Sequence, residues 1–128
     1  MPVFYVCAGL IGVLATILTI NISRLRRQKR INMGDGGDRD MLAAVRAHAN
    51  LIEFGPLCLL LIYFVSDFYG FRVVAGLSVA FLVSRVLHAG GMLGYIPQGR
   101  FLGALGTTLV LAVTSVLTVM VGITLKQF

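Results

Sequence analysis

The sequence predicts an all-α integral membrane protein, built as a bundle of four transmembrane helices. Of its 128 residues, 58% are hydrophobic and only 12% are charged, and the mean hydropathy is +0.92. In soluble domains about a quarter of the residues are charged. Apolar stretches of bilayer-spanning length recur along the chain. We therefore expect one membrane domain over residues 1–128.

The first predicted helix covers about residues 3–23. No charged residue precedes Arg24, and about 20 apolar residues are enough to cross the hydrocarbon core of a bilayer. The basic residues follow this apolar stretch, and no small-residue cleavage motif is present. A cleaved signal peptide has its basic residues first, so we expect a permanent membrane anchor.

The second and third predicted helices, at about residues 41–66 and 72–94, have short uncharged cores. Residues 54–66 contain 13 uncharged residues and residues 73–84 contain 12. A helix of 13 residues is about 20 Å long, whereas the hydrocarbon core is about 30 Å thick. Each span must therefore include polar residues near its inner end: Arg46, His48, Asn50 and Glu53 in the second helix, and Arg85 and His88 in the third.

The fourth predicted helix covers about residues 100–125 and has no charge between Phe101 and Leu125. Small and hydroxyl residues recur along it, a pattern that is typical of close helix packing. These residues are Gly99, Gly103, Thr107, Thr114 and Thr118.

The basic residues predict the orientation of the chain. Most of them crowd the first loop, and Arg100 lies on the third, whereas the second loop has Arg72 beside Asp67 and the C-terminus has Lys126. The positive-inside rule places loops one and three in the cytoplasm and both termini outside it. This topology and anionic lipid account for the net charge of +6 without a nucleic-acid partner. The basic residues of the first loop are Arg24, Arg26, Arg27, Lys29, Arg30 and Arg39.

The polar residues of the two middle helices are predicted to meet. Glu53 and Arg85 each lie 13 residues from the outer loop, so both should lie about 20 Å below the outer interface. Charges at such depth usually pair or line a wet cavity, and we therefore expect Glu53 to face Arg85. A purely structural ion-pair network is the alternative. His48 points away from the Arg46 face, toward another helix or subunit, or has only a structural role.

A cytoplasmic cleft with several arginines and one glutamate predicts an anionic ligand that also carries one cationic group. Two other sets of residues give weaker signals. Cys7 and Cys58 lie in different helices, and cysteine is often buried as a small hydrophobe, so neither a disulfide nor a metal site is indicated. The loop acids Asp35, Asp38 and Asp40 fit a solvated linker.

The segment Arg46-Ala-His-Ala-Asn50-Leu-Ile-Glu53-Phe-Gly-Pro56 resembles the second-helix signature of the MAPEG family, the membrane-associated proteins in eicosanoid and glutathione metabolism. Arg85-Val-Leu-His88 resembles its third-helix motif, Ser23-Arg24-Leu-Arg26-Arg27 the basic end of its first helix, and Arg100 opens the fourth. The resemblance extends over the whole chain and is strongest to the small bacterial members. It implies an inner-membrane homotrimer with glutathione bound between subunits near the cytoplasmic side.

The resemblance also implies roles for individual residues. Arg24 and Arg46 would bind the carboxylates of glutathione, and Asn50 and Glu53 its polar and ammonium groups. Arg85 and His88 would complete the wall of the site, and His48 is a further candidate for binding. Arg100 matches the arginine that faces the thiol and is the candidate catalytic residue. Phe54 and Met92 stand where other members carry tyrosines that contact the ligand.

The implied activity is that of a glutathione S-transferase or glutathione-dependent peroxidase. A free thiol has a pKa of about 8.5, and lowering it by two units takes about 2.7 kcal/mol of thiolate stabilisation, which one guanidinium can supply in a poorly hydrated site. The second substrate would be an apolar electrophile or peroxide from the bilayer. One alternative is a glutathione-binding protein without catalysis. Another is a small multidrug transporter, but such proteins carry their essential acid in the first helix, which has none here.

Overall fold

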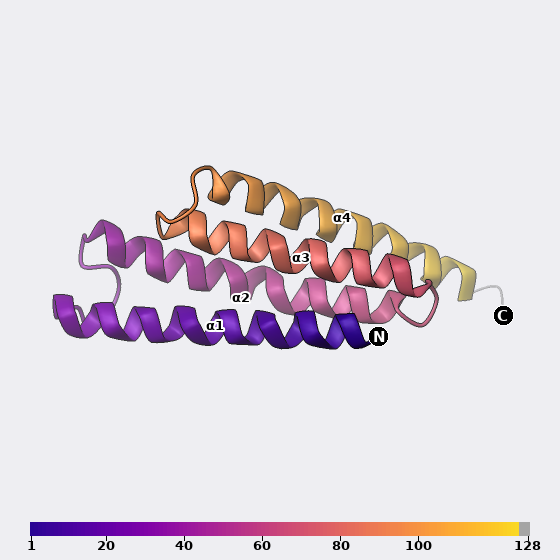
Figure 1. The fold of residues 1–128 in the computed structure, drawn as a ribbon, viewed down its shortest axis with the longest axis horizontal. Coiled ribbons are helices and arrows are strands. Elements are labelled where there is room, and N and C mark those ends of the chain that lie inside the picture. Colours follow the sequence, from indigo (N-terminus) through magenta and orange to yellow (C-terminus); the bar gives the residue numbers. More distant parts are fainter. Residues whose placement is uncertain (126–128) are drawn as a thin grey trace.

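The structure is a computed structural model that describes residues 1–125, so Lys126 lies outside the described part. Four helices make up the chain (Figure 1): α1 (Pro2–Lys29), α2 (Arg39–Val65), α3 (Phe71–Met92) and α4 (Gly99–Leu125). Each is long and apolar enough to cross a membrane, and residues 1–125 contain no strand. The prediction of an all-α bundle with four membrane-spanning helices is confirmed.

The helices alternate in direction, so that the α1–α2 and α3–α4 loops lie at one end of the bundle and the α2–α3 loop at the other (Figure 1). The basic first loop and Arg100 therefore share an end, as the charge pattern requires. In Figure 1, α1 and α2 extend past the α3–α4 loop at this end. The basic end is thus formed mainly by the first two helices.

The observed helix boundaries differ most from the prediction in α1, which continues to Lys29 instead of ending near residue 23. The apolar stretch ends at Arg24, but arginine, lysine and glutamine are good helix formers in water. The helix stops at Arg30, which adopts the left-handed conformation with φ 54°. Hydrophobicity therefore marks the end of the membrane span, and the helix itself ends two turns later.

The α1–α2 loop is held by specific contacts. Arg26 donates to the backbone carbonyls of Ile31 (3.4 Å) and Gly34 (2.9 Å). Lys29 pairs with Asp38 at 2.7 Å and with Asp40 at 3.3 Å. The Asp38 carboxylate also accepts a bond from the Met41 backbone N–H and so caps the start of α2. The Asp35 carboxylate accepts from the Gly37 backbone N–H at 3.0 Å, so all three loop acids have local structural contacts beyond those of a solvated linker.

Substituting Asp38 should weaken this end of the bundle in a pH-dependent way. The hydrogen bond from Lys29, and then that from the Met41 N–H, hold the pKa of Asp38 below its usual value. A depressed pKa means that the stabilisation is complete above the unfolded value of about 3.9 and is lost as the pH falls through the folded value. Near neutral pH, thermal unfolding should give the order wild type, then Asp38→Asn, which keeps a good cap, then Asp38→Ala. As the pH falls through the folded pKa of Asp38, the wild type should lose its advantage over Asp38→Asn, whereas the difference between Asp38→Asn and Asp38→Ala should persist because a neutral asparagine cap does not titrate. A pH-independent difference between wild type and Asp38→Asn would contradict the assignment.

The closest helix contact joins α3 to α4, while α1 and α4 do not touch each other. Its basis is a set of small residues on α4. A Cβ atom added to Gly103 would overlap backbone atoms of Ser84 and His88, and one added to Gly91 of α3 would overlap the backbone of Arg100. The expected packing role of the small-residue stripe is therefore confirmed. The buried residues of α4 are Gly99, Gly103, Thr107, Val110 and Thr114.

The remaining core lies between α1, α2 and α3. The α1 side chains Phe4, Cys7, Ile11 and Leu18 are buried, and they recur every three, four or seven residues, as expected for one helix face. The other faces of α1 are largely exposed and apolar. Cys7 and Cys58 are both buried free thiols. Exposed apolar surface of this extent is what a bilayer solvates.

Candidate functional site

The predicted polar face of α2 exists and points away from the bundle. Arg46 and Glu53 lie on it with their side chains 53% exposed, and Arg46 Nη1 lies 3.8 Å from a Glu53 carboxylate oxygen. Asn50, between them on the same face, is half-buried. The opposite face of α2 is buried. A guanidinium, an amide and a carboxylate are thus presented together on an outer surface.

The predicted pair between Glu53 and Arg85 is wrong for the single chain. Glu53 contacts Arg46 instead, and Arg85 is buried, with 1% of its surface exposed. Leu51 faces the core and is 1% exposed. Glu53 comes two residues later, a rotation of about 200° around the helix axis, so the directions of the two side chains differ by about 160°. Counting residues predicts how deep the two charges lie in the membrane, but it does not predict how α2 is rotated about its axis.

Arg85 lies in the α3–α4 contact. Its Nη1 donates to Thr107 Oγ1 at 3.3 Å, and its Nη2 donates to His88 Nδ1 at 3.4 Å. Arg85 Nε is the only fully enclosed side-chain nitrogen or oxygen in residues 1–125 that has no hydrogen-bond partner. Within this part of the chain, no carboxylate pairs with the guanidinium. Thr107 was assigned from sequence to packing alone, and no local signal marks it as a partner of Arg85.

Arg24 lines a polar hollow between the ends of α1, α2 and α3. Its guanidinium donates to the Asn21 side-chain oxygen at 2.9 Å. The hollow has a volume of about 310 Å³ and brings Arg24 close to Met92, two positions that the family resemblance assigns to one site. Sequence reasoning missed the other residues, because they come from three separate segments. The full lining is Asn21, Arg24, Leu25, Asp40, Ala43, Met92, Leu93, Gly94 and Tyr95.

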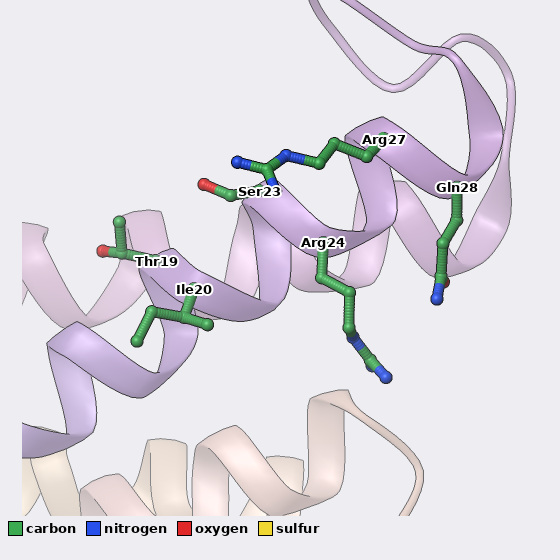
Figure 2. A pocket seen from close by; sticks show the side chains of 6 residues that line it. All are labelled: Thr19, Ile20, Ser23, Arg24, Arg27 and Gln28. Carbon is green, nitrogen blue, oxygen red and sulfur yellow. The ribbon is translucent and has the colours of Figure 1, made fainter.

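A second hollow of about 420 Å³ lies on the outer face of α1 (Figure 2). Arg24 borders both hollows. In Figure 2, Arg24 and Gln28 point to one side of the helix, whereas Ser23 and Arg27 point to another. Arg24 is exposed and can be reached from either hollow. The lining residues are Thr19, Ile20, Ser23, Arg24, Arg27 and Gln28.

His48 contacts another helix, as one of the two predicted alternatives required. Its Nε2 lies 3.1 Å from Thr19 Oγ1 on α1. The Thr19 hydroxyl donates to the Ala15 carbonyl at 2.9 Å, so its oxygen accepts from the His48 Nε2–H. His48 lines neither hollow. In the single chain it joins α1 to α2.

Arg100 is exposed in the first turn of α4. The close approach of Gly91 to its backbone fixes where α4 starts against the end of α3. It lines neither of the two hollows that Arg24 borders. The candidate residues of a single chain thus fall into separate groups. Arg46, Asn50 and Glu53 lie on the α2 face, and Arg85 and His88 lie in the α3–α4 contact, while the other three, His48, Arg24 and Arg100, lie in the α1–α2 contact, at the end of α1 and at the start of α4.

Comparison with known proteins assigns the chain to a protein family. The model of the MAPEG family matches residues 4–120, which include parts of all four helices and every candidate site residue. The chain belongs to the MAPEG family. The resemblance noted in the α2 and α3 motifs is thereby confirmed. Family membership makes this a membrane protein of the group named for eicosanoid and glutathione metabolism.

This MAPEG protein is also similar to two bacterial relatives. The inner membrane protein YecN of Escherichia coli strain K12 is 31% identical over 87 residues, which is 63% of this chain and 66% of the relative. YecN from Escherichia coli O6:H1 strain CFT073 matches with the same values. The alignment thus spans just under two thirds of the length of YecN.

Proposed function

We propose that this MAPEG protein is an inner-membrane homotrimer that binds glutathione between subunits and activates its thiol. The reaction would be transfer of the glutathione thiolate to an apolar electrophile, or reduction of a peroxide, arriving from the bilayer. The observation that carries the proposal is the exposed Arg46–Asn50–Glu53 face of a membrane-spanning helix. The inner-membrane location agrees with the name of the YecN relatives.

The exposed pair argues for a covering subunit. Arg46 and Glu53 lie within α2, and each side chain is about half exposed in the single chain. A charge facing hydrocarbon costs at least about 2.5–3.5 kcal/mol, so charged groups in membranes face protein or water. A second copy packed on this face removes both charges from lipid. Such an interface also brings a second set of polar groups, including Arg24 of a neighbour, within reach.

The chemistry of the face fits one end of glutathione. This tripeptide has two carboxylates, one ammonium group and one thiol. Arg46 and Asn50 suit a carboxylate, and Glu53 suits the adjacent ammonium, because charge-assisted hydrogen bonds are the strongest available. Arg24, on a different helix end, suits the second carboxylate. The ligand would therefore span two subunits.

Glutathione protection of a Glu53 variant tests the binding. A ligand present at 100 times its Kd stabilises the folded state by about 2.7 kcal/mol. Wild-type protein in detergent should therefore melt at a higher temperature with glutathione, whereas Glu53→Gln should lose most of this increase, since its amide cannot pair with an ammonium charge. Asp67→Asn, which changes an exposed acid at the other end of α2, is the matched control and should keep full protection. Full protection of Glu53→Gln would refute this binding mode.

Glutathione binding without turnover is the second candidate function. Met92 lines the hollow that Arg24 borders, and Phe54 follows Glu53 on α2. Both stand where the family resemblance expects tyrosines, so two hydroxyl groups that contact the ligand in other members are absent. A small multidrug transporter is less well supported, because α1 carries no acidic side chain.

The proposed orientation puts the site on the cytosolic side, where glutathione is available. A reporter that is active only outside the cytoplasm should be silent when fused near Met33 in the α1–α2 loop and active when fused after Phe128. The same pair of fusions with a cytoplasmic reporter should give the inverse pattern. Activity near Met33 in the first assay would place Arg24 and Arg100 on the opposite side of the membrane and exclude the proposed ligand supply.

A further inference from the structure

We propose that Arg85 is a positioning residue that holds His88 as the neutral Nε2–H tautomer, so that the ring meets its ligand as a hydrogen-bond donor and not as a base. The proposal rests on the geometry of the α3–α4 contact. Its consequence for glutathione chemistry rests on the proposed function, but the state of the ring does not.

The direction of the Arg85–His88 hydrogen bond decides the tautomer. Arg85 Nη2 lies 3.4 Å from His88 Nδ1. A guanidinium has donors only, so Nδ1 must accept and must carry a lone pair. The ring proton is then on Nε2 and the ring is neutral. A protonated imidazolium would also carry an N–H on Nδ1, and this donor would point at the positively charged guanidinium. Water could not screen the repulsion, because Arg85 is 1% exposed.

The guanidinium is held in this position from a second side. Its Nη1 donates to Thr107 Oγ1 at 3.3 Å, and Thr107 is itself 1% exposed. The backbones of α3 and α4 are in contact at Gly103, one turn before Thr107. Arg85 therefore has little room to turn away from His88, and the hydrogen bond is a fixed feature of the helix contact.

The other ring nitrogen remains available. His88 Nε2 makes no hydrogen bond within residues 1–125, and Arg85 Nε is the only fully enclosed side-chain nitrogen or oxygen of that part without a partner. Nε2 must therefore retain some accessible surface, although His88 as a whole is only 5% exposed. An N–H at this place suits a carboxylate, carbonyl or thiolate acceptor of the ligand. In the proposed reaction, His88 would then stabilise an anion and would not remove the thiol proton.

Nitrogen NMR of the histidine rings tests the proposal directly. The chain has two histidines, so protein labelled with ¹⁵N-histidine in detergent micelles gives two ring patterns, and His48→Gln assigns them. Near neutral pH and without glutathione, His88 should show one protonated nitrogen, Nε2, and an Nδ1 resonance displaced by an accepted hydrogen bond. A ring protonated on Nδ1, or on both nitrogens, in the wild-type protein would overturn the proposal.

Variants separate positioning from simple packing. Arg85→Met removes the donor and keeps an apolar stem, and Thr107→Val removes the hydroxyl that orients the guanidinium. Both should move the His88 Nδ1 resonance toward that of a free ring, and Arg85→Met should mix the two tautomers. Thr108→Val is the matched control, since the Thr108 hydroxyl donates only within α4, to Ala104.

Unchanged His88 resonances in both folded variants would overturn the proposal. If Arg85→Met does not fold, the wild-type tautomer and Thr107→Val still decide the outcome. Glutathione is added in a separate titration of the wild-type protein. If the ring is the Nε2–H tautomer but glutathione does not bind, the proposed function is refuted and the tautomer assignment stands. If glutathione binds but the ring is a different tautomer, the tautomer assignment is refuted and the proposed function stands.

Discussion

Gly103→Ala should strongly destabilise the bundle by forcing α3 and α4 apart. A Cβ atom at this position would overlap the backbone of Ser84 and His88, and backbone atoms cannot move aside as the end of a flexible side chain can. Overpacking of a core usually costs about 1–3 kcal/mol, and we expect the upper part of this range here. Thermal unfolding of the detergent-solubilised protein, followed by circular dichroism, measures the loss.

The matched control is Gly122→Ala in the same helix. A Cβ atom added there has no neighbour within 4 Å. Alanine is favoured over glycine in a helix interior by up to about 1 kcal/mol, so this variant should melt at the wild-type temperature or above it. Equal melting temperatures for the two variants would show that the α3–α4 contact is looser than the structure describes. Because His88 lies against Gly103, Gly103→Ala should also disturb its ring.

Arg100→Ala should separate glutathione binding from thiol activation. Under the proposed function, the carboxylate and ammonium contacts come from α1 and α2, and Arg100, in the first turn of α4, would face the thiol. Removing it should change glutathione affinity by less than about tenfold, or 1.4 kcal/mol. The bound thiol should then titrate near its solution value of about 8.5, about two units above the value expected in wild type, a loss of about 2.7 kcal/mol of thiolate stabilisation.

Ultraviolet absorbance of the thiolate, recorded as a function of pH, measures this effect. Arg100→Lys should be intermediate, because an ammonium offers charge without the planar fork of arginine. Arg72→Ala removes an exposed arginine from the opposite end of the bundle and should change nothing. Identical thiol titration in wild type and Arg100→Ala would remove Arg100 from the chemistry and leave it as an arginine that sets topology. A wild-type thiol that titrates near 8.5 would favour binding without turnover.

The membrane-spanning helices and their packing residues could be read from the sequence, because both depend on local properties of the chain. Hydrophobic length indicated the first and fourth spans, and the two middle spans followed from extending their short uncharged cores to bilayer thickness. Helical periodicity put Arg46, Asn50 and Glu53 on one face, as the structure has them. Gly99 and Gly103 of α4 were also correctly assigned to packing, since only a missing side chain allows two backbones to meet. The motif residues that indicated the MAPEG family lie in the same spans.

The partners of Glu53 and Arg85 were decided only by the tertiary structure. Depth along a helix follows from counting residues, but rotation about its axis depends on which faces pack, and packing turned Glu53 outward and Arg85 inward. The contact of Arg85 with Thr107 joins residues 22 positions apart, and the hollow at Arg24 joins three helix ends. No local pattern encodes such contacts, because they depend on how closely α3 and α4 approach through Gly91 and Gly103.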